Sequence, residues 1–288
     1  MKDQILHALV FDGYAAMLMI NASETTANAK ELLNLSTGTT YALGRLICAG
    51  AMLSQRNKSE SEKLTLMISG GGPCGKLLVT ADNHGNVKGC VDNPSCCLAQ
   101  EKVSLPSIVG KDGQMTVVRD NPLGAEPYVG LSNLVSGDIT RDFAAYLVTS
   151  EQQPAAVALD AAEKDGKVTC GGILVLPLPG CPNEVLDKIE EKISKIDDLL
   201  DKLNYHLSLE EMALDMFWDV GVKPLETVDL RYNCDCSRER FEQALVSLGK
   251  NELLSLAYEE ENTEICCRFC SKKYNFSSEE LKKLAKEL

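Results

Sequence analysis

The stretch Cys234-Asp235-Cys236, followed after thirty intervening residues by Cys267-Arg268-Phe269-Cys270, is the strongest structural signal in this sequence. It places a C-x-C pair and a C-x-x-C pair in the segment 231–288, which is too short to bury a comfortable apolar core. Two close pairs of thiols joined by a hairpin suit Zn²⁺, which takes four sulfur ligands tetrahedrally at about 2.3 Å. The spacing therefore predicts one zinc ion per chain, bound by these four cysteines.

Cys266 allows a second assignment of the C-terminal pair, because Cys266 with Cys270 would form a less usual chelate. We take Cys267 as the ligand and Cys266 as an extra cysteine. Four sulfurs fill the coordination sphere of zinc and leave no position for water or substrate, so a structural or regulatory role is expected instead of a hydrolytic one. Nearby cations favour thiolates, although a solvated face is the simpler interpretation of the basic residues Arg238, Arg240, Arg268, Lys272 and Lys273.

The whole chain has the composition of an ordinary folded protein. Its 288 residues are 44% hydrophobic and 25% charged, which excludes disordered and fibrous classes. A formal net charge of −13 disfavours nucleic acid and anionic membranes as partners. Asp3 and Asp12 interrupt any signal-peptide core, and no apolar run is long enough to cross a bilayer. We therefore expect a cytoplasmic protein whose twelve cysteines are thiols.

An α/β core domain is predicted over residues 1–180. Apolar residues at helical spacing predict helices over 31–35, 39–53 and 138–150. Alternating apolar residues between turn signals predict strands over 64–69, 76–80, 86–91 and 114–119. A hairpin is expected over 155–176, with its turn at Asp165-Gly166. The fold class is therefore α+β, with antiparallel-rich sheets.

A helical linker is predicted over residues 181–230, because prolines and Gly180 end the core domain at about residue 180. Residues 183–204 have an apolar residue at every third or fourth position, which predicts one amphipathic helix about 20 residues long. Ser208 and Glu211 have capping-box spacing and predict a second helix that ends before Gly221. The apolar stripe either packs on a core of the molecule or can be released from it.

The C-terminal domain, residues 231–288, is expected to contain short helices after Ser237 and Asn251 and a hairpin carrying residues 267–276. Ser277 with Glu280 has capping-box spacing and predicts a terminal helix.

The glycine-rich stretch Gly70-Gly71-Gly72-Pro73-Cys74-Gly75-Lys76 matches part of a phosphate-binding loop. Leu77 stands where that loop needs a hydroxyl for Mg²⁺, and the next residues predict a strand where a helix is required. We therefore interpret the stretch as a glycine turn between two strands and expect no nucleotide to bind. His7, His84 and His206 have no catalytic partner at a recognisable spacing.

Over nearly its whole length the sequence resembles the redox-regulated 33 kDa heat-shock chaperones, which are ATP-independent holdases of the bacterial cytosol. The resemblance rests on the run Cys234-Asp235-Cys236-Ser237-Arg238-Glu239-Arg240 together with Cys267-x-x-Cys270. Shorter matches are Ala42-Leu43-Gly44-Arg45, Gly71-Gly72-Pro73 leading to Gly89, Ser150-Glu151-Gln152, and Gly171-Gly172 before Pro179. The sequence departs from the family at Cys90, Leu176 and Cys266.

This resemblance implies a redox switch and no enzymatic activity. The reduced protein would bind Zn²⁺ and be inactive, whereas oxidation would join Cys234 with Cys236 and Cys267 with Cys270, release zinc, and unfold first the C-terminal domain and then the linker. The apolar surface of residues 183–204, Met212, Phe217 and Trp218 would then bind unfolded client proteins, with the active form a homodimer. Four further cysteines could add off-pathway disulfides: Cys90, Cys96, Cys97 and Cys266.

Two other classes of function are consistent with parts of the sequence. A zinc ribbon that binds nucleic acid or a protein partner would use the local basic patch at Arg238, Arg240, Lys272 and Lys273. A dithiol oxidoreductase would use the C-x-x-C pair, although the strand and helix context of thioredoxin-like motifs is missing. The net charge argues against the first alternative, and the missing context argues against the second.

Overall fold

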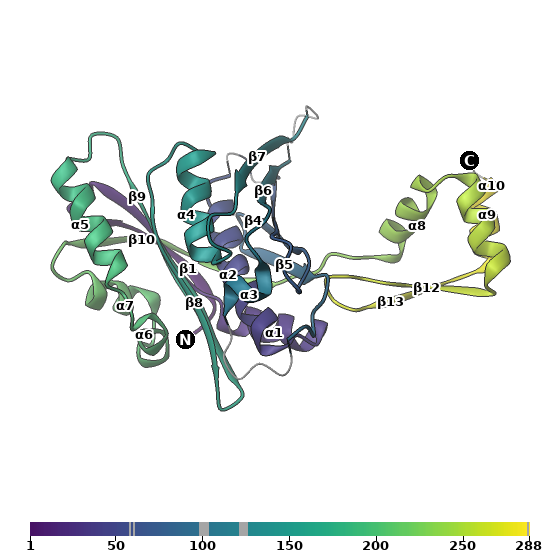
Figure 1. Ribbon diagram of the computed structural model, residues 1–288, viewed down its shortest axis with the longest axis horizontal. Helices are drawn as coiled ribbons and strands as arrows, with labels where there is room; N and C mark the ends of the chain where they lie inside the picture. Colours follow the sequence, from purple (N-terminus) through teal and green to yellow (C-terminus); the bar gives the residue numbers. More distant parts are fainter. Residues whose placement is uncertain (58, 60, 98–103, 121–125, 287) are drawn as a thin grey trace. The chain divides into compact units, whose positions relative to one another are not determined.

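A computed structural model describes residues 1–57, 59, 61–97, 104–120, 126–286 and 288. The chain divides into two compact units, Met1–Asn233 and Cys234–Leu288 (Figure 1). Residues 181–230 belong to the first unit, and their separate behaviour as a linker stays a prediction. Within the described part of the chain, no helix is long and apolar enough to cross a membrane.

The first unit contains a five-stranded antiparallel sheet in the order β10-β1-β2-β9-β8. Its strands are β1 (Gln4–Val10), β2 (Ala15–Asn21), β8 (Ala156–Lys164), β9 (Lys167–Pro177) and β10 (Val222–Asp229). The β8–β9 hairpin turns at Asp165 and Gly166, as predicted. The sequence did not predict β1 and β2 because side chains on both faces of β2 are buried, which removes the alternation that marks a half-exposed strand.

A second sheet has six strands in the order β11-β5-β4-β3-β6-β7. Its strands are β3 (Lys63–Ser69), β4 (Leu77–Asp82), β5 (Asn86–Val91), β6 (Gln114–Arg119), β7 (Tyr128–Asn133) and the two-residue β11 (Arg231–Tyr232). The four strands predicted here are confirmed to within two residues. β11 runs parallel to β5 and all other neighbours are antiparallel.

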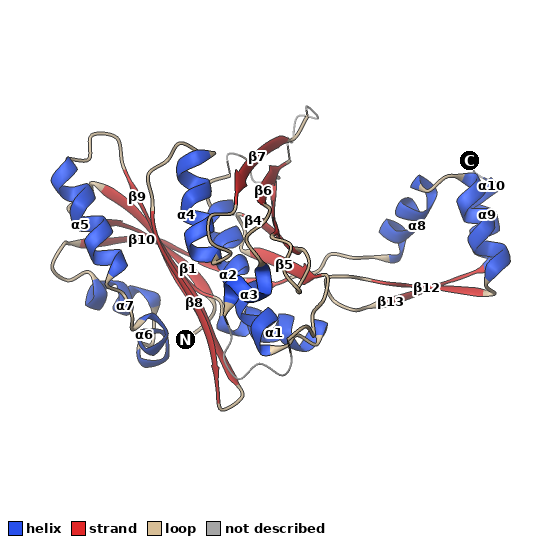
Figure 2. Ribbon diagram, in the orientation of Figure 1, coloured by secondary structure: helices blue, strands red, loops and turns tan. Residues whose placement is uncertain are grey.

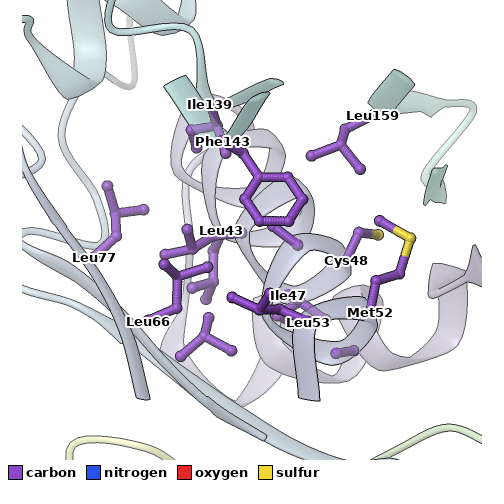
Figure 3. Close-up of a cluster of buried hydrophobic side chains, with 14 of the residues drawn as sticks. Leu43, Ile47, Cys48, Met52, Leu53, Leu66, Leu77, Ile139, Phe143 and Leu159 are labelled. Carbon is purple, nitrogen blue, oxygen red and sulfur yellow. The ribbon is translucent and has the colours of Figure 1, made fainter. Parts of the chain in front are cut away.

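The main core lies between the two sheets around helix α2 (Thr37–Ser54), which contacts strands of both (Figures 2 and 3). Ser36 begins α2, since its side chain accepts a hydrogen bond from the backbone N–H of Thr39. Phe143 of α4 (Ile139–Thr149), Leu43 and Ile47 of α2 and Leu66 of β3 are among the fully buried side chains. Helix α3 (Leu105–Val109) completes this layer.

Helix α1 (Ser23–Leu33) corrects the predicted helix over 31–35, which begins much too late. The side chain of Asp3 forms the cap of α1, because Asp3 Oδ1 and Oδ2 accept hydrogen bonds from the backbone N–H groups of Glu24 (3.1 Å) and Thr25 (2.6 Å). Burial raises the pKa of Asp3. A cap that comes from a residue about twenty positions earlier in the chain leaves no local signal at the start of the helix.

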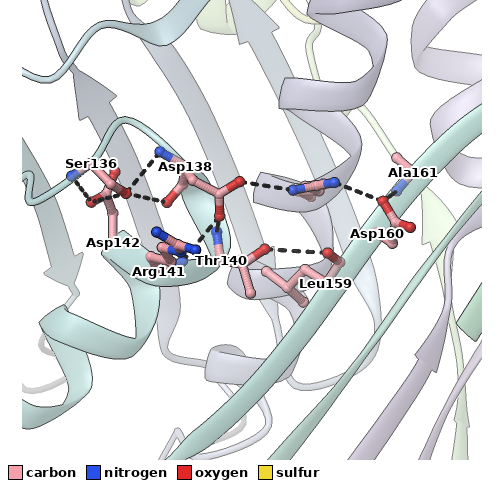
Figure 4. A network of polar contacts seen from close by, with 9 residues as sticks. Ser136, Asp138, Thr140, Arg141, Asp142, Leu159, Asp160 and Ala161 are labelled. Atoms are coloured by element: carbon pink, nitrogen blue, oxygen red, sulfur yellow. Dashed lines mark hydrogen bonds and ion pairs between the residues drawn. The ribbon is translucent and has the colours of Figure 1, made fainter. Parts of the chain in front are cut away.

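Two ion-pair networks connect the helices to the sheets. Arg45 of α2 pairs with Asp138 Oδ2 at 3.2 Å and with Asp160 Oδ1 at 2.7 Å, and Asp138 also caps α4 (Figure 4). Glu151 accepts a hydrogen bond from Arg119 at 2.7 Å and pairs with Arg56 at 3.4 Å. The short matches around Arg45 and Glu151 therefore correspond to contacts that hold the core together.

Helices α5 (Asn183–Ser194), α6 (Leu199–Tyr205) and α7 (Leu209–Met216) cover the other face of the five-stranded sheet. The single helix predicted over 183–204 is wrong, since residues 195–198 interrupt it. Asp197 and Asp198 lie in this interruption, and aspartate is unfavourable inside helices and common at their starts. The apolar residues keep their spacing of three or four across the interruption, so the sequence pattern did not indicate where α5 ends. The Ser208 cap of α7 is confirmed.

The stretch Gly70 to Lys76 is a turn between β3 and β4, as predicted, and the chain enters a strand at Leu77. A Cβ at Gly72 would lie 2.3 Å from the carbonyl oxygen of Ile108. The glycine is therefore required by close backbone packing.

The second unit contains α8 (Arg238–Ser247), α9 (Lys250–Glu259), the hairpin β12 (Asn262–Cys266) and β13 (Lys273–Ser277), and α10 (Ser278–Lys286). The predicted caps at Ser237 and Ser277 are confirmed, with Glu280 N–H donating to Ser277 Oγ and Ser277 N–H donating to Glu280 Oε2. Its core has seven buried residues: Leu245, Leu253, Ala257, Tyr274, Phe276, Leu281 and Ala285. Such a core is small for an independent unit.

Phe217 and Trp218 provide a matched pair for testing how α5–α7 are held. Phe217 is fully buried beneath the helices, whereas Trp218 is 80% exposed. Replacing Phe217 by Ala should lower the free energy of unfolding by about 3–5 kcal/mol, because it leaves a cavity against the sheet. Trp218→Ala should change it by less than about 0.5 kcal/mol. Urea denaturation of the reduced protein, followed by circular dichroism, measures both, and equal effects would contradict the packing described.

Candidate metal centre

Four cysteine sulfurs of the second unit converge on one point. Cys234 Sγ lies 3.6 Å from Cys267 Sγ, and Cys236 Sγ lies 3.5 Å from Cys270 Sγ. All four sulfurs lie within 4.8 Å of one another. A tetrahedron with metal–sulfur bonds of about 2.3 Å separates its sulfurs by about 3.8 Å. The group therefore has the size and the chemistry of a site for a thiophilic cation.

The local backbone positions each pair. Cys234 and Cys236 lie just before α8, whose cap is Ser237. Cys267 and Cys270 lie in the loop between β12 and β13, where the backbone N–H of Cys267 donates to Lys272 O at 2.9 Å and that of Ser271 donates to Cys267 O at 2.8 Å. These bonds fold the loop back on itself, so its two thiols face the same point.

The surroundings act differently on the individual thiols. Burial raises the pKa of the Cys234 thiol, although the backbone N–H of Cys236 stabilises its thiolate and opposes the shift. Burial also raises the pKa of the Cys270 thiol, against the backbone N–H of Lys272. For Cys236, hydrogen bonds from the Tyr274 hydroxyl and the neighbouring thiols outweigh burial and lower the pKa. A cation among the sulfurs would favour the thiolate form of all four.

Tyr274 contacts the site directly, and sequence reasoning did not identify it. Its hydroxyl oxygen lies 3.3 Å from Cys236 Sγ and donates a hydrogen bond to Cys236 O at 3.1 Å. The hydrogen bond with Cys236, followed by burial, raises the pKa of Tyr274 to about 12. The ring packs against Phe241 with a centroid distance of 4.8 Å. In the sequence, Tyr274 is one alternating residue of a hairpin, and nothing local marks it as part of a site.

The other cysteines lie apart from this group. Cys266 is exposed, with its sulfur 3.9 Å from the carbonyl oxygen of Cys267, and it does not join the four. Cys90 is buried, and Cys96 and Cys97 are half-buried. Among the described residues, no other group of three or more cysteine, histidine or acidic side chains is arranged to hold a metal ion.

The basic side chains near the thiols form ion pairs with acidic neighbours. Arg238 pairs with Glu280 at 2.6 Å, Arg240 with Asp235 at 2.6 Å, and Lys273 with Glu264 at 2.8 Å. These contacts favour the simpler interpretation of the basic residues as a paired, solvated surface. Two of the three histidines have side-chain partners, since His7 contacts Gln55 and His206 contacts Asp215.

Family, sequence and structure comparisons all identify similarity to the same family of proteins. The family described as "Hsp33 protein" matches residues 3–277. The 33 kDa chaperonin of Thermoanaerobacter sp. (strain X514) is 38% identical over 289 residues, covering 99% of this chain and 98% of the relative. That of Bacillus cereus (strain B4264) is 36% identical over 293 residues, covering both chains fully. The crystal structure of the 33 kDa chaperonin from Thermotoga maritima superimposes with a TM-score of 0.86 at 29% identity, covering 100% of this chain and 99% of that one.

Tyr274→Phe should weaken the binding of Zn²⁺ by about tenfold, because it removes the hydroxyl that supports Cys236 and keeps the ring against Phe241. Tyr258→Phe is the control, since Tyr258 lies in the same unit and is 75% exposed. Competition with a chromophoric zinc chelator measures both affinities. An unchanged affinity in Tyr274→Phe would show that the hydroxyl does not support the site.

Proposed function

The chain belongs to the Hsp33 family of chaperones, and from this we propose that it is a redox-regulated, ATP-independent holdase of the cytoplasm. The observation that carries the proposal is the group of four thiols, which lies in a unit with only seven buried core residues. A unit of this kind loses structure when its ligands are removed, since metal-binding free energy in small sites is also folding free energy. Members of the family are named chaperonins and not enzymes.

In the reduced protein, Cys234, Cys236, Cys267 and Cys270 would bind one Zn²⁺. The donor set supports this choice, because four thiolates in a tetrahedral arrangement are typical of structural zinc. Zinc would add a cross-link between the segment just before α8 and the loop of the β12–β13 hairpin, beside the few apolar contacts that join these elements in the small core. The tetrahedral shell has no open position, so the site has no hydrolytic chemistry.

Oxidation by a peroxide would remove these ligands. Two thiols lose two electrons to form one disulfide, and the peroxide is reduced to two molecules of water; a second equivalent oxidises the second pair. We assign the disulfides to Cys234 with Cys236 and to Cys267 with Cys270, following the family resemblance. The sulfur contacts of 3.5 and 3.6 Å join Cys236 to Cys270 and Cys234 to Cys267. Peptide mapping of the oxidised protein distinguishes these pairings from the assigned ones.

The apolar surface for clients would come from α5, α6 and α7. Ile189, Ile193, Leu199, Leu203 and Met212 are buried against the five-stranded sheet. The helices are joined at the surface by ion pairs between Lys192 and Asp219 and between Lys202 and Asp215, which contribute little in water. Release of these helices would expose a contiguous apolar face suited to unfolded proteins.

The connection between the units supports this order of events. β10 and β11 lie at the edges of their sheets and directly precede Cys234 in the chain. β11 pairs with β5 through only two residues. Unfolding of the second unit would remove the constraint on β11 first and then on β10, and α5–α7 precede both strands in the sequence. Following the family resemblance, we propose that the partners are unfolded client proteins and, in the active form, a second copy of the chain, without nucleic acid, membrane or nucleotide.

Metal analysis of reductively purified protein should show one zinc per chain. Cys236→Ser and Cys270→Ser should each abolish binding, because three thiolates and a hydroxyl bind zinc far more weakly. Cys96→Ser and Cys266→Ser are the controls and should keep full occupancy. Full zinc occupancy in Cys270→Ser would falsify the ligand assignment.

Peroxide with mild heat should release zinc and start the suppression of client aggregation, and dithiothreitol should reverse both. Hydrogen exchange should increase from about residue 183 to the C-terminus while residues 1–180 stay protected, because only the later segment depends on the metal. Light scattering of unfolding citrate synthase, with zinc release followed in parallel, measures the activity. Equal suppression by the reduced, zinc-loaded protein would contradict the redox switch.

A further inference from the structure

The six-stranded sheet has one covered face and one open face. Its inward side chains, such as Leu64, Leu66 and Val117, are fully buried in the main core. The outward side chains of the middle rows are half-buried or exposed. From β4 to β7 these outward residues are uncharged, whereas Lys88 of β5 continues the row of Thr80; the uncharged set is Thr65, Met67, Leu78, Thr80, Thr116, Val118, Val129 and Leu131. We call this set the outer face.

The outer face ends at β7, an edge strand whose outer side pairs with no strand of the described residues. Proteins block exposed edges with charges, proline or very short strands. Edge strand β10 contains Lys223 and Pro224, edge strand β8 contains Glu163 and Lys164, and β11 has only two residues. β7 is six residues long, with the sequence YVGLSN, and has neither charge nor proline. Tyr128, Val129 and Leu131 are each more than half exposed.

The hydrogen-bond ladder shows which backbone groups of β7 point outward. The backbone N–H of Leu134 donates to Gly113 O at 2.9 Å, so the alternation of an antiparallel ladder directs the even-numbered residues of β7 toward β6. The N–H and C=O groups of Val129 and Leu131 therefore point away from the sheet. No strand among the described residues pairs with this side of β7.

We propose that β7 binds an extended, uncharged, apolar-rich segment of an unfolded client protein as an additional strand of this sheet. This inference rests on the proposed holdase function and adds where and in what conformation the client binds. The occupant must supply unpaired backbone donors and acceptors, together with apolar side chains at every second position that continue the rows of Val129 and Leu131. Unfolded chains have these features, whereas folded proteins pair their own backbone groups.

The β7 site and the surface under α5–α7 would act together. One added strand of six residues is a weak contact on its own, which is consistent with an edge that is open before any oxidation. A client held also by the surface that α5–α7 expose would bind β7 at a high effective concentration. The β7 contact would then strengthen client retention only in the oxidised protein.

The test compares V129K/L131K with V129T/L131T and with L32K. The two lysines place charges on the edge, the two threonines keep β-propensity without charge, and Leu32 is an exposed leucine on α1. After oxidation, we expect V129K/L131K to need about fivefold more protein than the wild type for half-suppression of citrate synthase aggregation, since it loses two favourable cross-strand positions. The threonine variant and L32K should stay within about twofold of the wild type. Circular dichroism and zinc content of the reduced proteins check the fold.

Amide hydrogen exchange tests whether the client binds at β7, and sedimentation tests whether β7 instead joins two copies of the chain. Client binding should slow exchange at the Val129 and Leu131 amides of the wild type, and unchanged exchange would overturn the inference. Unimpaired suppression by V129K/L131K would overturn it while leaving the holdase function intact, whereas inactive oxidised wild type would overturn the proposed function itself. If the lysine variant alone sediments as a monomer where the wild type is a dimer, β7 joins two copies of the chain and the client assignment is wrong.

Discussion

Four sulfur atoms within 4.8 Å of one another form the constraint on which the second unit depends. As thiolates they repel each other, and burial raises the pKa of the Cys234 and Cys270 thiols. A cation among them would convert this repulsion into attraction, and structural zinc sites contribute about 10–16 kcal/mol of apparent binding free energy. A core of seven buried side chains is too small to stabilise the unit by a comparable free energy. A reaction that removes the sulfur ligands would therefore also lower the folding free energy of the second unit.

The first unit is built in the opposite way. Its core lies between two sheets, with α2 buried along nearly its whole length, and Arg45 and Glu151 join separate elements through ion pairs. None of these contacts involves the four clustered cysteines. In the proposed mechanism, a change in the oxidation state of the second unit would therefore act on α5–α7 and on the edge strands β10 and β11, and the strands formed by residues 1–180 would stay folded.

The two sheets differ in what covers their outward faces. α5–α7 cover the five-stranded sheet with side chains such as Ile189 and Phe217, whereas the outer face of the six-stranded sheet ends in the open edge at β7. In the proposed mechanism, the apolar surface under α5–α7 would become accessible only when these helices are released, and the edge at β7 would be too small to retain a client alone. If strong client binding requires both surfaces, it would occur only in the state in which α5–α7 are released.

Sequence alone determined those features whose signals are local. The cysteine spacing identified the four sulfurs that lie together, the capping residues Ser208, Ser237 and Ser277 marked helix starts, and alternation located β3 to β6. Each depends on residues a few positions apart, where backbone geometry fixes the period. The resemblance to the Hsp33 family rested on the same short motifs.

Tertiary structure decided the features that depend on distant residues. The cap of α1 comes from Asp3, which lies just before β1. β2 lost its alternation because both of its faces are covered. Residues 195–198 break a helix whose apolar period continues through the gap. Tyr274 reaches Cys236 only because the β12–β13 hairpin packs beside α8. The exposure of β7 likewise depends on which strand ends the sheet. In each case the deciding contact joins residues far apart in the chain, so no local pattern could contain it.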